Sequence, residues 1–185
     1  MPQDYFQQRK QALLSKQDKS HIGIWDKKIK KLCNLINKYP QYYTTSSCSG
    51  RIIIMIDNEK KAKGLFRFVS HEKVNLKKFM KNIPNTKQNL KFKQEPMILH
   101  IACKNLENAN HLLKIAQKSG FKKIGIIAMN KRIIIEINAS EKIEFPLMQK
   151  NKLLVNKEFL KIVLKKANKN LENNWKKIKK FEKLI

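Results

Sequence analysis

Acidic residues are scarce in this 185-residue chain. It contains 14 Asp plus Glu against 41 Lys plus Arg, so its formal net charge is +27. A lysine-rich thermophilic composition normally brings glutamate with it, so composition bias alone does not explain the imbalance. The hydrophobic fraction of 42% is that of a folded protein rather than of a disordered basic tail. The charge therefore predicts a polyanionic partner, RNA or DNA first and an anionic membrane surface second.

Long apolar runs are missing as well. No run approaches the roughly 20 residues that a membrane span requires. The N-terminal stretch MPQDYFQQRKQALLS also lacks the apolar core of a secretion signal. We therefore expect a cytosolic protein with no membrane partner. The length is that of a single domain, 1–185, large enough to bury a core.

Cysteine is the third scarce residue type. Cys33, Cys48 and Cys103 are widely spaced, and the chain has no C-x-x-C pair. This pattern argues against a disulfide framework and against a zinc site. In the stretch HIAC, His100 and Cys103 are three residues apart on an expected strand, so they would point to opposite faces and could not share one ion. We expect no metal.

A glycine-rich G-x-G turn between a first strand and a helix is also absent, which argues against the Rossmann fold. Helical periodicity predicts a helical N-terminal segment over 1–40, a helix from Leu106 that ends near Gly120, and a long basic helix over 156–185. Short apolar runs predict strands within a core over 42–147. We expect an α+β fold with one mixed, largely antiparallel sheet flanked by helices. The similar stretches GRIIIMI and KRIIIEI suggest two related halves, each a helix plus three strands.

One stretch stands apart from the charged background. TTSSCSGRI, residues 44–52, places small hydroxyl residues, a cysteine and a glycine before Arg51 and a strand that we expect to be buried on both faces. Short residues let a backbone turn and bring its N–H groups close to a ligand, and an adjacent arginine favours an anion. We expect a loop that binds an anionic group.

The same stretch resembles the signature of the wybutosine-synthesising tRNA methyltransferase family. Further blocks resemble that family in order along the chain: SKQDKSHIGIWD (15–26), EPMILHIAC (95–103), GFKKIGI (120–126), FPL (145–147) and ANKNLENNWKKIKKF (167–181). The resemblance spans nearly the whole chain. It implies an enzyme that uses S-adenosylmethionine to methylate N4 of the tricyclic guanine derivative at position 37 of phenylalanine tRNA.

The resemblance also implies site residues. The donor-binding residues would be Thr45, Ser46, Ser47, Cys48, Ser49, Gly50 and Arg51. They would hold either the amino-acid carboxylate of the donor or a phosphate of nucleotide 37. Cys48 is included as a binding residue and not as a nucleophile, because methylation of nitrogen needs no covalent adduct.

The acceptor nitrogen must lose its proton at about the time that it is methylated, so a proton acceptor within hydrogen-bond reach would promote the reaction. The candidates are His71, His100 and, if burial raised its pKa, Glu95. His100 lies between Leu99 and Ile101, so it could equally be a hydrogen-bonded histidine of the sheet.

Residues expected to contact RNA are Lys19, Ser20, Phe66, Lys122 and Lys123. Aromatic rings stack on unpaired bases of an anticodon loop, and lysines meet phosphates. A second reading from another class is a non-catalytic RNA-binding protein of the translation apparatus. A phosphate-transferring enzyme is a third, but the chain lacks a G-K-[ST] element and a cluster of metal-binding carboxylates. The sequence does not indicate an oligomeric state.

Overall fold

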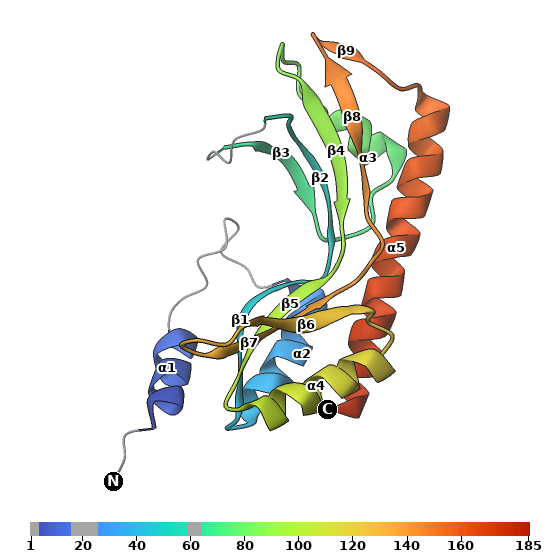
Figure 1. Cartoon of the computed structure of the whole chain (residues 1–185). Coiled ribbons are helices and arrows are strands. Elements are labelled where there is room, and N and C mark those ends of the chain that lie inside the picture. Colours follow the sequence, from blue (N-terminus) through green and yellow to red (C-terminus); the bar gives the residue numbers. More distant parts are fainter. Residues whose placement is uncertain (1–3, 16–25, 59–63) are drawn as a thin grey trace. The chain divides into compact units, whose positions relative to one another are not determined.

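The computed structural model describes residues 4–15, 26–58 and 64–185 (Figure 1). Helices and antiparallel strands alternate irregularly along these residues, so the predicted α+β class is confirmed. The chain divides into two compact units. Unit 1 comprises Met1–Ser49, Ile98–Ser140 and Trp175–Ile185, and unit 2 comprises Gly50–Met97 and Glu141–Asn174. Within the described ranges, no helix is both long and apolar enough to cross a membrane.

Unit 1 is built on a four-stranded antiparallel sheet. The strand order is β1 (Tyr42–Cys48), β5 (Ile98–Cys103), β7 (Ile133–Asn138) and β6 (Lys123–Ala128). Its helices are α1 (Tyr5–Leu14), α2 (Lys27–Lys38) and α4 (Leu106–Lys118). The carboxylate of Asp26 accepts a hydrogen bond from the backbone N–H of Lys28 and thereby caps the start of α2. The helix α2 ends at Lys38, and Tyr39 is extended because the following Pro40 disfavours helix at the residue that precedes it.

Successive side chains along each strand point to opposite sides, so the sheet of unit 1 has two different faces. Leu99, Ile101, Ile135 and Ile137 are fully buried on one face, and α2 and α4 pack against the sheet. On the other face, α1 covers one end, where Phe6 and Leu13 pack against Tyr43, Ala102 and Ile134. The second face therefore carries the residues of these strands that are free to meet a ligand.

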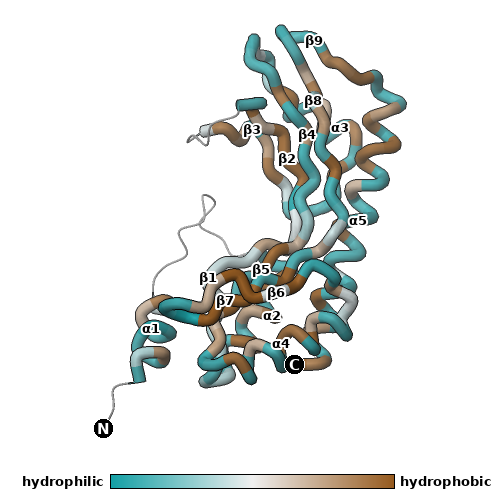
Figure 2. Tube along the Cα trace, viewed as in Figure 1, coloured by the Kyte–Doolittle hydropathy of each residue, from teal (hydrophilic) through white to brown (hydrophobic). Residues whose placement is uncertain are grey.

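Unit 2 is built on a five-stranded antiparallel sheet. The strand order is β3 (Phe66–Ser70), β2 (Arg51–Ile56), β4 (Leu90–Glu95), β8 (Ile143–Gln149) and β9 (Lys152–Leu153). The helix α3 (Leu76–Lys81) and the helix α5 (Lys157–Leu184), up to Asn174, complete this unit. The remaining turns of α5 belong to unit 1. In Figure 2, β2 carries a brown, hydrophobic stretch, whereas β4 and α5 alternate between hydrophilic and hydrophobic residues.

The core of unit 2 is aromatic. The ring of Phe92 in β4 stacks on that of Phe145 with centroids 4.9 Å apart, and Phe79 of α3 meets Phe92 edge-on at 5.7 Å. Ile52, Ile53 and Ile54 of β2 are completely buried. The prediction that the RIIIMI strand is covered on both faces is therefore confirmed.

The prediction of one mixed sheet is wrong, because the strands form two sheets and every pair is antiparallel. The ladder is interrupted at Gly50, whose φ is +101°, and at Pro96, which has no N–H to donate. On one side of these breaks β1 pairs with β5, and on the other side β2 pairs with β4. The stretches GRIIIMI and KRIIIEI thus lie in different sheets, each as an interior strand.

The prediction that the hydroxyl-rich stretch forms a loop is wrong for most of its residues. Tyr42–Cys48 form β1, and Ser46, Ser47 and Cys48 pair in register with residues of β5. Serine and threonine fit a half-buried pleated surface when neighbouring strands satisfy their backbone groups. Only Ser49 and Gly50 connect β1 to β2.

Candidate active site

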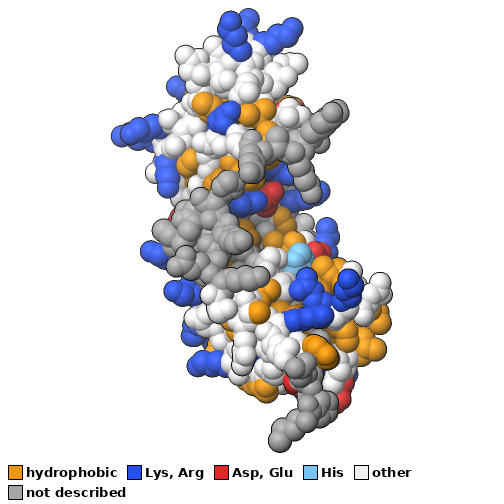
Figure 3. All heavy atoms as spheres, turned by 90° about the vertical axis from the view of Figure 1, so that its left-hand side faces the viewer, with side chains coloured by type: hydrophobic (Ala, Val, Ile, Leu, Met, Phe, Trp, Pro, Cys, Tyr) orange, Lys and Arg blue, Asp and Glu red, His pale blue; other side chains and the backbone are white. Residues whose placement is uncertain are grey.

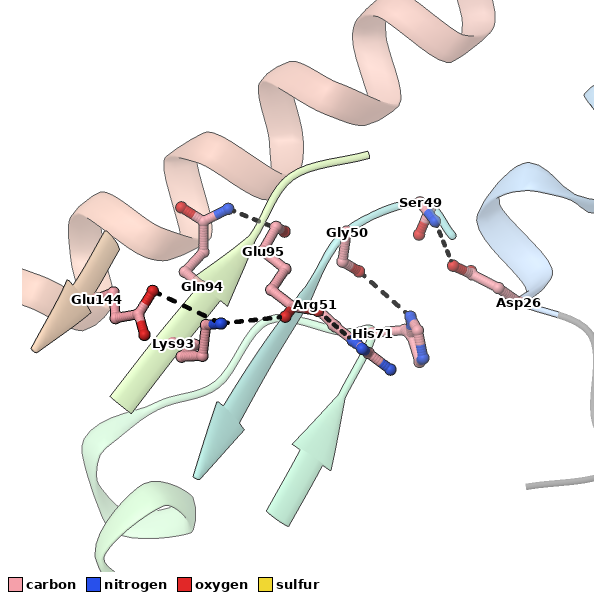
Figure 4. A network of polar contacts seen from close by, with 9 residues as sticks. All are labelled: Asp26, Ser49, Gly50, Arg51, His71, Lys93, Gln94, Glu95 and Glu144. Atoms are coloured by element: carbon pink, nitrogen blue, oxygen red, sulfur yellow. Dashed lines mark hydrogen bonds and ion pairs between the residues drawn. The ribbon is translucent and has the colours of Figure 1, made fainter. Parts of the chain in front are cut away.

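The connection between β1 and β2 is held in unit 1 by a carboxylate. The backbone N–H of Ser49 donates to Oδ2 of Asp26 at 2.6 Å, and Ser49 is completely buried (Figure 4). This N–H is therefore already bound to an anion within the protein. Asp26 was missed by sequence reasoning, although it lies inside the block SKQDKSHIGIWD and caps α2.

In unit 1, two of the predicted donor-binding residues meet a predicted proton acceptor. Oγ of Ser46 lies 2.8 Å from Nδ1 of His100, and the hydroxyl of Thr45 donates to the carbonyl oxygen of His100 at 3.4 Å. Nε2 of His100 lies 2.7 Å from a carboxylate oxygen of Glu136. His100 is thus an ordered, hydrogen-bonded histidine whose side chain remains 26% exposed. Its role as a proton acceptor stays a prediction, and its geometry is compatible with it because a held and accessible imidazole can exchange a proton.

In unit 2, His71 lies against the start of β2. Its Nδ1 is 3.2 Å from the carbonyl oxygen of Gly50 (Figure 4). A carbonyl only accepts, so Nδ1 carries the proton of this hydrogen bond and, in the neutral ring, Nε2 is the basic nitrogen. Nearby, N–H of Val74 donates to Asn168 of α5, whose side-chain amide donates back to the Val74 carbonyl, both at 2.9 Å. These two bonds fix the segment that follows His71.

Also in unit 2, Arg51 and Glu95 form an ion pair across β2 and β4. Nε of Arg51 donates to Oε2 of Glu95 at 2.7 Å, and the guanidinium lies over the ring of Phe66 at 5.2 Å from its centroid. The pair leaves the terminal nitrogens of the guanidinium for another acceptor, so Arg51 is oriented rather than neutralised. Phe66 is 40% exposed.

Glu95 is less buried than its predicted role requires. Its role as a proton acceptor depended on burial, but its side chain is 30% exposed and also lies 3.7 Å from Nζ of Lys93. Lys93 in turn approaches Glu144 at 3.5 Å (Figure 4). Held between Arg51 and Lys93, the Glu95 carboxylate fixes the position of the Arg51 guanidinium. On the same face, the hydrogen bond to Asp57 raises the pKa of Lys91.

The structure describes two of the four remaining residues that were predicted to contact RNA. Lys122 and Lys123 are exposed at the start of β6 in unit 1. Lys19 and Ser20 lie outside the described residues. Lysine and arginine side chains are spread over the face shown in Figure 3, and acidic side chains are few. Their density on the surface fits a partner whose charge is distributed along a backbone.

Buried asparagines of α5 are a second feature that sequence reasoning missed. Asn170 is 3% exposed and donates to the side chain of Gln94 at 2.7 Å, and Asn174 is completely buried. Among the described residues, neither polar atom of the Asn174 side chain has a hydrogen-bond partner. The available signal was the position of Asn174 within the apolar stripe, three residues after Leu171 and four before Ile178.

Native-state alkylation with iodoacetamide is expected to modify Cys48 and to spare the other two cysteines. Burial raises the pKa of the Cys33 thiol to about 11 and that of Cys103 to about 12, so both stay protonated at neutral pH. Cys48 is partly exposed. Peptide mass spectrometry before and after unfolding measures the difference. Rapid labelling of Cys103 in the folded protein would contradict the described core of unit 1.

The protein is thus of the α+β class, with two antiparallel sheets and without the Rossmann fold. Its polar sites contain histidines, carboxylates and an arginine held in position. The family model described as methyltransferase TYW3 matches residues 8–185. The chain therefore belongs to the TYW3 methyltransferase family, and the predictions of the family and of a methyltransferase are confirmed.

Relatives and solved structures agree with this assignment. The chain is 34% identical over 191 residues to the tRNA wybutosine-synthesizing protein 3 homolog of Danio rerio, covering 100% of this chain and 76% of that protein. It is 35% identical over 179 residues to a Thermococcus sibiricus protein named tRNA(Phe) 7-((3-amino-3-carboxypropyl)-4-demethylwyosine(37)-N(4))-methyltransferase, covering 95% and 91%. The structure of the PH1069 protein from Pyrococcus horikoshii OT3 matches with a TM-score of 0.85 at 30% identity, covering 98% of this chain and 93% of that one.

Proposed function

We propose that this protein transfers a methyl group from S-adenosylmethionine to N4 of the tricyclic wyosine-type base at position 37 of phenylalanine tRNA. The observation that carries the proposal is the match to the named archaeal methyltransferase, which extends over 91% of that relative's length. A cytosolic location accords with such a substrate. The acceptor is either the plain tricyclic base or the form that already carries the aminocarboxypropyl side chain.

The chemistry sets what the residues must do. The donor supplies a methyl group on a positively charged sulfonium, so the protein must hold the acceptor nitrogen in line with it, about 3 Å away, and exclude water. Thr45 to Arg51 are the proposed donor-binding residues, with Arg51 facing a carboxylate or a phosphate. His71 and His100 are the proposed proton acceptors, and Glu95 is retained as the residue that orients Arg51.

Contacts to tRNA are supported by charge and by one exposed ring. A formal charge of +27 attracts the phosphate backbone, and exposed lysines at the start of β6 and along α5 are suited to it. Phe66, already covered on one side by Arg51, offers an aromatic surface for the anticodon loop. We include Lys19 and Ser20 in the proposed interface on the basis of the sequence block alone.

Isothermal titration calorimetry with S-adenosylmethionine separates this proposal from a non-catalytic RNA-binding protein. We expect saturable donor binding at about one site per chain, and binding of tRNA that weakens steeply as salt rises. A folded protein that binds tRNA but gives no donor heat at several temperatures would favour the RNA-binding alternative.

A further inference from the structure

Four residues form one row across the sheet of unit 1. Ser46 of β1 is directly opposite His100 of β5, His100 is opposite Glu136 of β7, and Glu136 is opposite Gly125 of β6. Directly opposed residues on neighbouring antiparallel strands point to the same side of the sheet. The row therefore lies on a single face, the one that α1 covers at its other end.

The hydrogen bonds in this row have a defined direction. An ionised carboxylate only accepts, so Glu136, at 2.7 Å, requires a proton on Nε2 of His100. In the neutral ring Nδ1 is then the basic nitrogen, and it accepts the hydroxyl proton of Ser46 at 2.8 Å. The lone pairs of the Ser46 oxygen remain for an N–H donor that approaches from outside.

The row is accessible at both ends. Ser46 is exposed, and the side chains of His100 and Glu136 are 26% and 33% exposed. A Cβ added at Gly125 would meet no described atom within 4 Å. A glycine inside a strand marks a place where another group can approach the backbone closely. A flat heteroaromatic ring can therefore lie over Gly125 beside the carboxylate.

Within the described ranges, few other charges face His100. On the same face of the neighbouring strands, the other charged residue is Lys123 of β6. From α1, Arg9 and Lys10 are bound to the backbone carbonyls of Lys131 and Tyr39, respectively. Among the described residues, Glu136 is thus the carboxylate that holds the imidazole.

We propose that Ser46, His100 and Glu136 form a proton relay for the acceptor ring, an inference that rests on the proposed function and that assigns the Ser46 hydroxyl to the acceptor instead of the donor. As the C–S bond of the donor breaks and the new N–C bond forms, the proton of the ring nitrogen passes to Ser46. The hydroxyl proton of Ser46 passes at the same time to Nδ1 of His100. The resulting imidazolium is stabilised by Glu136 and later releases its proton to water. Glu136 is a positioning residue, and Gly125 keeps the relay open to a planar ring.

Glu136→Gln removes the charge and preserves the shape. We expect kcat for methyl transfer to fall about 100-fold, the scale of general acid–base catalysis, while KM for tRNA changes less than twofold. Glu136→Asp should recover part of kcat. The matched control is Glu107→Gln, an exposed glutamate of unit 1 in the first turn of α4, which should leave kcat unchanged. Equal kcat for Glu136→Gln and Glu107→Gln would overturn the relay.

A second readout needs no activity. In ¹⁵N spectra of the free protein at mildly basic pH, His100 should carry its proton on Nε2, with the resonance identified by its loss in His100→Gln. A proton on Nδ1 instead would overturn the relay even in an active enzyme. A wild-type protein that transfers no methyl group would refute the proposed function, whereas an active wild type with an indifferent Glu136→Gln variant refutes the relay alone.

Discussion

Replacing Gly50 with alanine is expected to lower the free energy of unfolding by about 2 to 4 kcal/mol. The φ of Gly50 is +101°, where an L-residue with a side chain is strained by roughly 1 to 2 kcal/mol. An added Cβ would also lie 2.8 Å from Nδ2 of Asn174 and 3.1 Å from the carbonyl oxygen of Glu95, so overpacking adds a similar cost. Denaturant unfolding followed by circular dichroism measures the change.

Gly125→Ala is the control for that experiment, because its Cβ enters open space within a regular strand. It should be neutral or slightly stabilising, since alanine restricts the unfolded chain more than glycine does. If the two variants unfolded at the same denaturant concentration, the positive φ of Gly50 and its close packing against Asn174 and Glu95 would be refuted.

Replacing Arg51 with alanine is expected to weaken binding of one anionic ligand by about 1 to 3 kcal/mol, roughly 5- to 150-fold. The reason is the loss of a charge-assisted hydrogen bond from a guanidinium that Glu95 and Phe66 already hold in place. Calorimetry with S-adenosylmethionine and with tRNA shows which ligand is affected, and thus whether Arg51 faces the donor carboxylate or a phosphate.

Arg67→Ala removes the same charge from the neighbouring strand of unit 2. Arg67 donates to the carbonyl of Gly64 and to Gln88, and is exposed. It should lower tRNA affinity only slightly and leave donor affinity unchanged. Unaltered affinity of Arg51→Ala for both ligands would remove Arg51 from the site.

The helices could be read from the sequence because their signals are local. The apolar stripe predicted a helix over 156–185, and α5 spans Lys157–Leu184. The division into two sheets could not be read in the same way. Isoleucine-rich strands look alike in sequence, and which strand each one pairs with depends on contacts tens of residues away. Gly50 and Pro96 were visible, but the sequence did not reveal that both interrupt a ladder.

The candidate site residues were also hard to predict, because they are brought together by contacts between distant parts of the sequence. Sequence reasoning singled out Ser46 and His100 separately, and the strand register brings them together across 54 residues. Glu136 escaped notice because it is one polar residue in the run RIIIEI, which predicts a buried strand. Asp26 escaped notice because a helix-capping aspartate is common, and nothing local indicated that it also binds Ser49. Residues that are far apart in the sequence and bind each other only in the folded protein show no characteristic spacing, so the sequence does not reveal these pairs.

The most direct test is mass spectrometry of nucleosides from phenylalanine tRNA that carries the demethylated tricyclic base. The tRNA is incubated with the purified protein, with and without S-adenosylmethionine, using both the plain base and the form with the aminocarboxypropyl side chain. We predict a donor-dependent gain of one methyl group at position 37 with at least one acceptor. Bound tRNA that gains no mass in either form would contradict the proposed methyl transfer.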